Sequence, residues 1–461
     1  MQKKPGRLQS WFGVQDMTVG RPMDSLVRFS IPLLVGNLAQ QLYNTVDSVV
    51  VGNFVGTEAL AAVGATTIIV NMLVFFFNGF ATGASVVIGR YFGARDMEQL
   101  HKSVETTMAA TFLLSLFFTV GGVLAVEPML KFMSTPEDVF PQAAVYLRIY
   151  NAGCSGFLIY NMGSGLLRAV GDTTRPLYFL ILTSVLNIVL DLVFVLVFHA
   201  GIAGVAYATI LSQFISAGLV LLLLTKSHDI YRLSWKDMKI DMGILGQIVS
   251  VGLPAGIQSV ITSLSNIFVQ SYINFFGSGC MAGWSCYNKL DQFVMLPMQS
   301  MALAATTFVS QNIGAGKLKR VEKGIFSSIA LTLGFTGVII ALVDLFAPQA
   351  VELFTNDPVV VDYGVRFTRL ILVFMLFNCI NHVLAGGLRG MGDSKGPMII
   401  MLLSFVAIRQ TYLYVMTHYI SNTAMVVGFG YPVGWMSCCI IEVSYFFLRR
   451  KKLLSRYEER L

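Results

Sequence analysis

An internal repeat constrains this chain more than any other feature of its sequence. Matching residues recur 221 positions apart along most of its length. Near the start the register slips by one residue, where Pro32 matches Pro254. The matching pairs include Gly56 and Gly277, Arg148 and Arg369, Arg168 and Arg389, Asp172 and Asp393, and Pro176 and Pro397. A duplication of this length predicts two domains of the same fold.

The composition places both copies in a membrane. Of the 461 residues, 55% are hydrophobic and only 12% are charged, and the mean hydropathy is +0.69. Soluble proteins carry about 25% charged residues, and a spanning helix needs about 20 apolar residues. About twelve stretches qualify, at 28–52, 61–88, 104–126, 143–167, 177–198, 202–225, 246–274, 281–309, 325–347, 366–388, 398–418 and 424–448. A duplicated, apolar chain of this kind is typical of secondary transporters.

The net charge of +7 follows the predicted topology. Basic residues gather in every second connection, for example at Arg90 and Arg95, at Lys317 to Lys323, and at Arg449 to Lys452. The positive-inside rule then predicts twelve spans with both termini in the cytoplasm, in the cell (inner or plasma) membrane. The basic balance therefore needs no nucleic-acid partner. The six cysteines show no spacing typical of a metal or redox site.

Six spans in each copy return the chain to its starting side, so the lobes are predicted to be parallel repeats about an axis along the membrane normal. The predicted fold is an all-α integral membrane protein of twelve transmembrane helices in two six-helix lobes. Its predicted parts are a cytoplasmic N-terminal lead (1–27), an N-terminal lobe (28–225), a polar cytoplasmic linker (226–243), a C-terminal lobe (244–448) and a basic cytoplasmic tail (449–461). Trp11 and Phe12 in the lead are flanked by Lys3, Lys4, Arg7 and Arg21, which predicts a short interfacial segment at the cytoplasmic face.

Polar residues converge in the first copy. In the first span, Asn37, Gln40, Asn44 and Asp47 are spaced to share one helix face. Asn187 and Asp191 share a face of the fifth span, and the sixth contributes Thr209. The span directions place Asp47, Asp191 and Thr209 in the outer half of the membrane, with Asn187 near its middle.

Two carboxylates at matched depth are suited to holding one positive charge. Burial and a second carboxylate both favour uptake of a proton, and the same oxygens are hard ligands for a small cation such as Na⁺. Asp47, Asn187, Asp191 and Thr209 are therefore the predicted coupling site for H⁺ or Na⁺. The alternative is that either aspartate only caps or pairs structurally, and polar stripes also hold helices together.

The second copy does not repeat this chemistry. Phe268 (or Val269), Ile408, Tyr412 and Gly430 stand where the first copy has Asp47, Asn187, Asp191 and Thr209. The second copy instead carries Arg409 and Asp291 deep in spans, and one hypothesis pairs them, because an unpaired charge is costly there. The alternatives are separate partners or a role of Asp291 with substrate or proton. Further candidates for a polar cavity lining are Asn37, Gln40, Asn44, Asn161, Asn266, Asp291 and Arg409.

Several segments together resemble the multidrug and toxic compound extrusion (MATE) family. They are Ile31 to Leu34, Tyr43 to Asp47, Leu166 to Asp172, Asn187 to Asp191, which resembles the prokaryotic DinF-like branch, and Ala206 to Thr209. The resemblance covers nearly the whole chain. It implies two six-helix lobes and cation-driven drug export, and it maps family cation sites onto Asp47, Asn187, Asp191 and Thr209. Some branches use acidic residues in spans 7 and 10, where this chain has none deep in the membrane.

The predicted function is an H⁺- or Na⁺-coupled antiporter that exports amphipathic, cationic drugs or toxic compounds by alternating access. No cofactor, no catalytic residue and no enzyme activity are expected, and the expected partners are the bilayer and a small-molecule substrate of a monomer. The first alternative is a flippase for lipid-linked saccharides or other lipids, which predicts a strongly basic cleft. The second is a membrane receptor or enzyme, for which no nucleophile–base or metal motif stands out.

Overall fold

The computed structural model describes residues 14–133, 135–137, 139–226, 231–236 and 238–458, without the side chains of residues 48, 57, 58, 60, 61, 65 and 68. The interfacial segment around Trp11 and parts of the expected linker and tail lie outside these residues. Throughout the described part the regular elements are helices, and no strand is present. The chain divides into two compact units, which comprise Met1–Asp16 with Val35–Gly252 and Met17–Leu34 with Leu253–Leu461.

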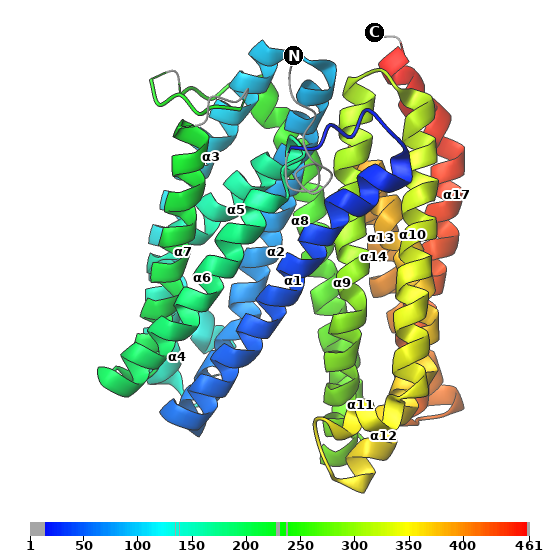
Figure 1. The fold of residues 1–461 in the computed structure, drawn as a ribbon. Helices are drawn as coiled ribbons and strands as arrows, with labels where there is room; N and C mark the ends of the chain where they lie inside the picture. The colour runs from blue at the N-terminus through cyan, green and yellow to red at the C-terminus, as the bar shows by residue number, and fades with distance from the viewer. Residues whose placement is uncertain (1–13, 134, 138, 227–230, 237, 459–461) are drawn as a thin grey trace. The chain divides into compact units, whose positions relative to one another are not determined.

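The first unit is a bundle of long helices, labelled in Figure 1. It includes the later part of α1 and the beginning of α8. Its elements are α1 (Pro22–Val50), η2 (Val51–Val55), α2 (Thr57–Ala94), α3 (Met97–Phe132), α4 (Phe140–Ala152), α5 (Cys154–Ala169), α6 (Thr174–Leu192), η3 (Val193–Val197), α7 (Gly201–Lys226) and α8 (Met242–Asn274).

The second unit repeats this order of helices with more interruptions. Its elements after α8 are α9 (Ser278–Gly314), α10 (Leu318–Leu345), α11 (Ala347–Glu352), α12 (Pro358–Ile371), η4 (Leu372–Phe374), α13 (Met375–Gly390), α14 (Lys395–Leu402), η5 (Leu403–Ile408), α15 (Arg409–Val415), η6 (Met416–Ile420), α16 (Ala424–Gly428) and α17 (Gly430–Glu458). Its largest core surrounds the buried Trp284, whose ring meets those of Tyr287, Phe367 and Tyr431.

All twelve expected spans have helical counterparts, which confirms the all-α membrane fold. Ten helical segments within the described residues are long and apolar enough to cross a membrane by length and composition. The other two expected spans do not meet this criterion of length and apolar composition, and each has a local reason. The 29 residues of α1 carry the polar stripe that ends at Asp47, and the fourth span is divided at Gly153 into α4 and α5, with 13 and 16 residues.

The duplication extends to the backbone of a turn. Gly171 and Gly392, 221 positions apart, both adopt positive φ angles, of 93° and 83°. In each copy the following aspartate caps the next helix: Asp172 accepts hydrogen bonds from the backbone of Thr174 and Arg175, and Asp393 accepts one from Gly396. Both aspartates therefore hold the first turn of the helix that follows, and the shared Gly-Asp sequence is explained by backbone geometry.

Residues 17–34, which include the first part of α1, pack with the second unit. The backbone amide of Met17 donates to Gln311 Oε1 (3.0 Å), and Arg320 Nη2 donates to the carbonyl of Val19 (2.8 Å). Met17, Leu26 and Phe29 are buried beside Phe308. Residues 28–34 therefore lie in the second unit rather than the expected first lobe, because the apolar side chains around them are buried there.

The described residues of the polar stretch between the copies pack against the first unit. Tyr231 is buried and accepts a hydrogen bond from Arg175 (2.6 Å), and Trp235 stacks on Phe112. Asp241 caps α8 by accepting from Gly243 and Ile244. The division between the units falls later, between Gly252 and Leu253 within α8, and not in the expected linker at 226–243.

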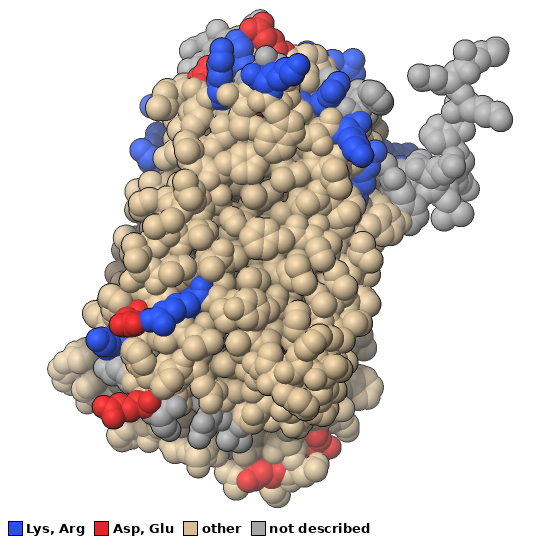
Figure 2. Space-filling view, turned by 90° about the vertical axis from the view of Figure 1, so that its left-hand side faces the viewer, with Lys and Arg blue, Asp and Glu red and all other residues tan. Residues whose placement is uncertain are grey.

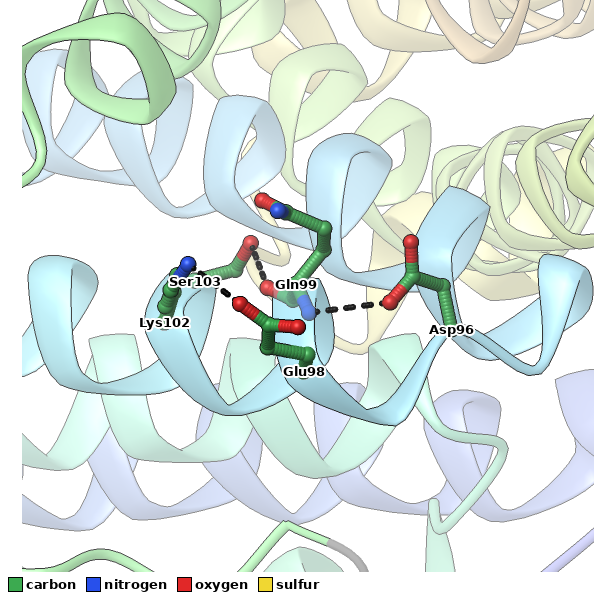
Figure 3. Close-up of polar contacts among 5 residues, drawn as sticks. All are labelled: Asp96, Glu98, Gln99, Lys102 and Ser103. Atoms are coloured by element: carbon green, nitrogen blue, oxygen red, sulfur yellow. Dashed lines mark hydrogen bonds and ion pairs between the residues drawn. The ribbon is translucent and has the colours of Figure 1, made fainter.

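Charged side chains avoid the middle of the visible surface. In Figure 2, lysines and arginines gather at one end, and a broad uncharged band lies below them before a few charges reappear. Such a band matches the hydrocarbon core of a bilayer. Figure 3 shows polar contacts at the start of α3, where Asp96 caps the helix by accepting a hydrogen bond from the backbone N–H of Gln99, and where exposed Glu98 pairs with Lys102 (2.6 Å).

Candidate functional site

The polar stripe of α1 reaches its most enclosed position at Asp47. Gln40 and Asn44 are exposed, whereas Asn37 and Asp47 are partly buried. A carboxyl oxygen of Asp47, Oδ1, is itself shielded from solvent. The helix places the four side chains on one face, but only Asp47 is brought against the acidic residue of α6 in the contacts described here.

Two further elements supply the other predicted ligands. Asp191 is fully buried on α6, and Asn187 lies one turn earlier on the same face. In the orientation that satisfies both ends of its amide, Asn187 donates to Asp191 Oδ2 (3.1 Å) and accepts from the backbone N–H of Thr209 (3.2 Å). Asn187 thus links α6 to α7 and fixes one oxygen of the Asp191 carboxyl.

The carboxyl groups of Asp47 and Asp191 lie within hydrogen-bonding distance of each other. Within the described residues, Oδ1 of each is buried and accepts no hydrogen bond. Two negative charges this close repel each other strongly in a poorly solvated place, so the pair is suited to holding a proton between its oxygens or a cation beside them. The structure therefore brings all four predicted residues together in the first unit.

Tyrosines that the sequence reasoning missed complete the surroundings of the pair. The hydroxyl of Tyr43, one turn before Asp47, lies within hydrogen-bonding distance of the Thr209 side chain. Tyr146 on α4 is buried near Asp47 and stacks on Tyr150. The spacing of Tyr43 and Asp47 on one helix face was a usable signal, whereas nothing in the sequence pattern related Tyr146 to the acidic residues.

Both helices that carry the acidic pair continue into π-helical turns. η2 begins four residues after Asp47, η3 begins two residues after Asp191, and the two segments contact each other. A π-helical turn within a helix often marks a functional site, because the widened turn leaves backbone groups less regularly bonded. Both helices therefore depart from regular α-helical geometry just after the residues whose carboxyl groups meet.

In the second unit, Arg409 and Asp291 do not form the hypothesised ion pair: among the described side chains, no ion pair joins them. Arg409, 1% exposed, donates to Asn266 Oδ1 (3.1 Å) and lies over the rings of Phe405 and Tyr431. Asp291 instead accepts a hydrogen bond from Tyr287 (3.1 Å). The ion pair does not form because the Arg409 guanidinium makes cation–π contacts with these two rings, where a carboxylate was expected.

The remaining candidate, Asn161, donates to the carbonyl of Phe157 in its own helix (2.8 Å). The positions opposite the acidic pair in the second unit hold no acid: Tyr412 donates to the carbonyl of Val426, and Phe268 is largely exposed. Groups of three or more metal-ligating acidic, cysteine or histidine side chains are absent from the described residues. Any cation at Asp47 and Asp191 therefore depends on amide, hydroxyl and backbone oxygens as well.

Comparison with known families fits the duplicated architecture. A model of the MatE family matches the chain twice, over residues 32–193 and 254–415. The chain belongs to the MatE family. The two matches begin at Pro32 and Pro254, the pair at which the internal repeat begins. The chain is therefore a multi-pass membrane protein of a transporter family, and its two halves are copies of one family unit.

Relatives and solved structures agree over nearly the full length. The Bacillus subtilis proteins described as probable multidrug resistance proteins YoeA and YpnP are both 30% identical, covering 94% and 96% of this chain and 95% and 99% of their own. A MOP superfamily transporter from Pyrococcus furiosus has a TM-score of 0.90 at 27% identity, and an outward-facing multidrug resistance MATE family transporter has 0.90 at 26%. Each covers 96% of this chain and 98% of the solved one.

Proposed function

We propose that the protein is a cation-coupled antiporter that exports amphipathic, cationic compounds. The observation that carries this proposal is the contact between the Asp47 and Asp191 carboxyl groups inside the first unit, with Asn187 and Thr209 beside them. Such a pair binds one positive charge more readily than it tolerates two negative ones. The relatives described as multidrug resistance proteins support drugs as the substrate class.

The coupling works through alternating access. A cation, H⁺ or Na⁺, enters from outside and neutralises the Asp47–Asp191 pair, and its release inside is exchanged for export of substrate. The available energy is about 2.3 kcal/mol per charge per 100 mV, plus about 1.36 kcal/mol for each pH unit. Asn187 orients Asp191, and Tyr43 extends the polar surroundings toward Thr209. The working unit is a monomer without cofactor, in the cell membrane with both termini in the cytoplasm.

Transport by the purified chain in proteoliposomes tests the proposal and identifies the ion. Ethidium, an amphipathic cation, serves as the probe, and a pH gradient or a sodium gradient is imposed in separate experiments. Ethidium flux above that of empty liposomes, driven by one of the gradients, is the expected result. Absence of flux with either gradient contradicts the proposal. Scrambling of a fluorescent anionic lipid without any ethidium flux favours the flippase alternative.

A further inference from the structure

Besides Asp291, the second unit buries another carboxyl group, that of Glu442 on α17. Its side chain is 0% exposed. One oxygen, Oε1, has no hydrogen-bond donor within the described residues, and the other faces only the Cys438 thiol, at a sulfur–oxygen distance of 3.8 Å. A thiol is a weak donor. A carboxylate left in this state would forgo nearly all of the solvation that it has in water, at a cost of several kcal/mol.

The charged neighbour of Glu442 is Arg389 on α13. The two side chains interact electrostatically, but no ion pair joins them among the described contacts. Arg389 Nη1 donates instead to Gln258 Oε1 on α8 (3.2 Å), and its buried Nε has no acceptor in the described part. Gln258 in turn donates to the sulfur of Met401 (2.8 Å). An arginine and a glutamate thus lie near each other, and each has an atom unsatisfied.

No other charged side chain near α17 pairs with Glu442 among the described contacts. The elements packed against α17 carry several titratable or charged side chains: Cys379, His382 and Arg389 on α13, Lys395 on α14, and Arg409, Tyr412 and Tyr414 on α15. Near the level of Glu442, α17 itself adds Tyr431, Cys438, Cys439 and Tyr445. Arg409 is engaged with Asn266, and Tyr445 donates to Asp393. None of these described side chains forms an ion pair with Glu442.

We propose that Glu442 is a second proton-binding site, in which a proton and Arg389 compete for the same carboxylate. The arrangement described by the structure is that of the protonated form, in which a neutral carboxyl group needs no ion partner and Arg389 bonds to Gln258. Loss of the proton leaves a carboxylate, which draws Arg389 from Gln258 into an ion pair. A metal ion is disfavoured, because a hard cation such as Na⁺ or Ca²⁺ needs several oxygen ligands and this site offers one carboxyl beside a guanidinium.

Proton binding at Glu442 would also change how two helices are joined. Gln258 stands one turn after Pro254, which lies inside α8 and donates no backbone hydrogen bond. The Arg389–Gln258 bond therefore fastens α13 to α8 next to a proline, where α8 bends most easily. Protonation of Glu442 keeps this bond, and deprotonation releases it. The proposal does not depend on the coupling role of Asp47 and Asp191.

Infrared difference spectroscopy of the full-length protein in lipid, recorded between acidic and alkaline buffers, tests this inference. The probe is the carbonyl stretch of a protonated carboxylic acid. We expect one such band to be lost in Glu442→Gln and to persist in the double variant Asp47→Asn/Asp191→Asn. A titration of proton uptake should show one proton fewer per molecule in Glu442→Gln. Spectra and uptake equal to those of the wild type in Glu442→Gln would overturn the proposal.

A second variant keeps the test decisive if Glu442→Gln does not fold. Arg389→Gln removes the competing cation and leaves the carboxyl group in place. The Glu442 band should then persist to higher pH than in the wild type, because the carboxylate has lost its partner. Glu322→Gln, which removes the partly exposed partner of Arg450, serves as the control and should leave that band unchanged. A carboxyl titration in Arg389→Gln that coincides with the wild type throughout would refute the competition.

Discussion

At the scale of single residues, the first unit concentrates its polar chemistry at one contact. Asp191 is fully buried, and one of its oxygens is held by Asn187 while the other is left without a donor in the described part. Exposed carboxylates of the same chain behave differently: Glu98 simply pairs with Lys102 on the surface of α3 (Figure 3). The same functional group thus forms an exposed ion pair in one place and leaves a buried oxygen without a donor in the described part in the other.

Asn187→Ala should weaken both stability and coupled transport. It removes the donor to Asp191 Oδ2 and the acceptor of the Thr209 amide, and a lost buried hydrogen-bond partner costs about 1–3 kcal/mol. Thermal unfolding in detergent and ethidium flux in proteoliposomes measure the two effects. Asn161→Ala is the matched control, since Asn161 bonds only within its own helix among the contacts described. Equal behaviour of the two variants would contradict the orienting role of Asn187.

At the scale of helices, the duplication is visible in geometry as well as in residue identity. The Gly-Asp turn after α5 recurs after α13, with the same positive φ at glycine and the same capping by aspartate. The π-helical turns differ in their neighbours: in the first unit they follow the acidic residues, whereas in the second η5 precedes Arg409. The helices were duplicated, and the side chains beside their irregular turns have diverged.

Asp172→Ala and Asp393→Ala should each lower the free energy of unfolding by roughly 0.5–2 kcal/mol, the usual cost of a lost helix cap. The two losses should be similar because the turns are equivalent. Thermal unfolding of each variant measures them. Asp172→Asn and Asp393→Asn keep an acceptor oxygen and should unfold closer to the wild type. A large loss in one copy beside none in the other would show that the turns are not equivalent.

Close packing of α2 and α8 depends on the absence of a side chain at Gly83. A Cβ atom there would lie 2.3 Å from the carbonyl oxygen of Ile248, which is backbone and cannot rotate away. Gly83→Val should therefore destabilise the first unit by about 1–3 kcal/mol, as overpacking usually does. Gly64→Ala, in the same helix with open space around it, should be neutral or stabilising. Thermal unfolding compares the two, and a Gly83→Val protein as stable as Gly64→Ala would refute the close approach.

At the scale of the whole molecule, the sequence predicted what depends on periodicity and repetition. Twelve spans were predicted from apolar length and two like units from the 221-residue repeat. The grouping of Asp47, Asn187, Asp191 and Thr209 was predicted from shared helix faces together with matched depth in the membrane. The role of the four residues in coupling is a proposal that transport measurements test.

What the sequence did not predict depends on tertiary contacts. Residues 17–34 join the second unit because Met17 and Phe29 find a buried place beside Phe308, and no periodic pattern specifies that partner. The predicted Arg409–Asp291 ion pair was wrong because the Arg409 guanidinium lies over the rings of Phe405 and Tyr431 instead. Glu442 was missed because one acidic residue near the end of an apolar span resembles a charge at the membrane surface until its burial is known.

Coupled transport by aspartate variants tests the central claim most directly. Ethidium flux is measured in proteoliposomes with the driving ion gradient, for the wild type, Asp47→Asn, Asp191→Asn and the double variant. Glu98→Gln is the control, because an exposed pair contributes little.

Each single variant should fall to the level of empty liposomes, and the double variant should be no worse, because residues that act as one site are not additive. Flux equal to that of the wild type in both single variants would contradict the assignment of the coupling site to Asp47 and Asp191.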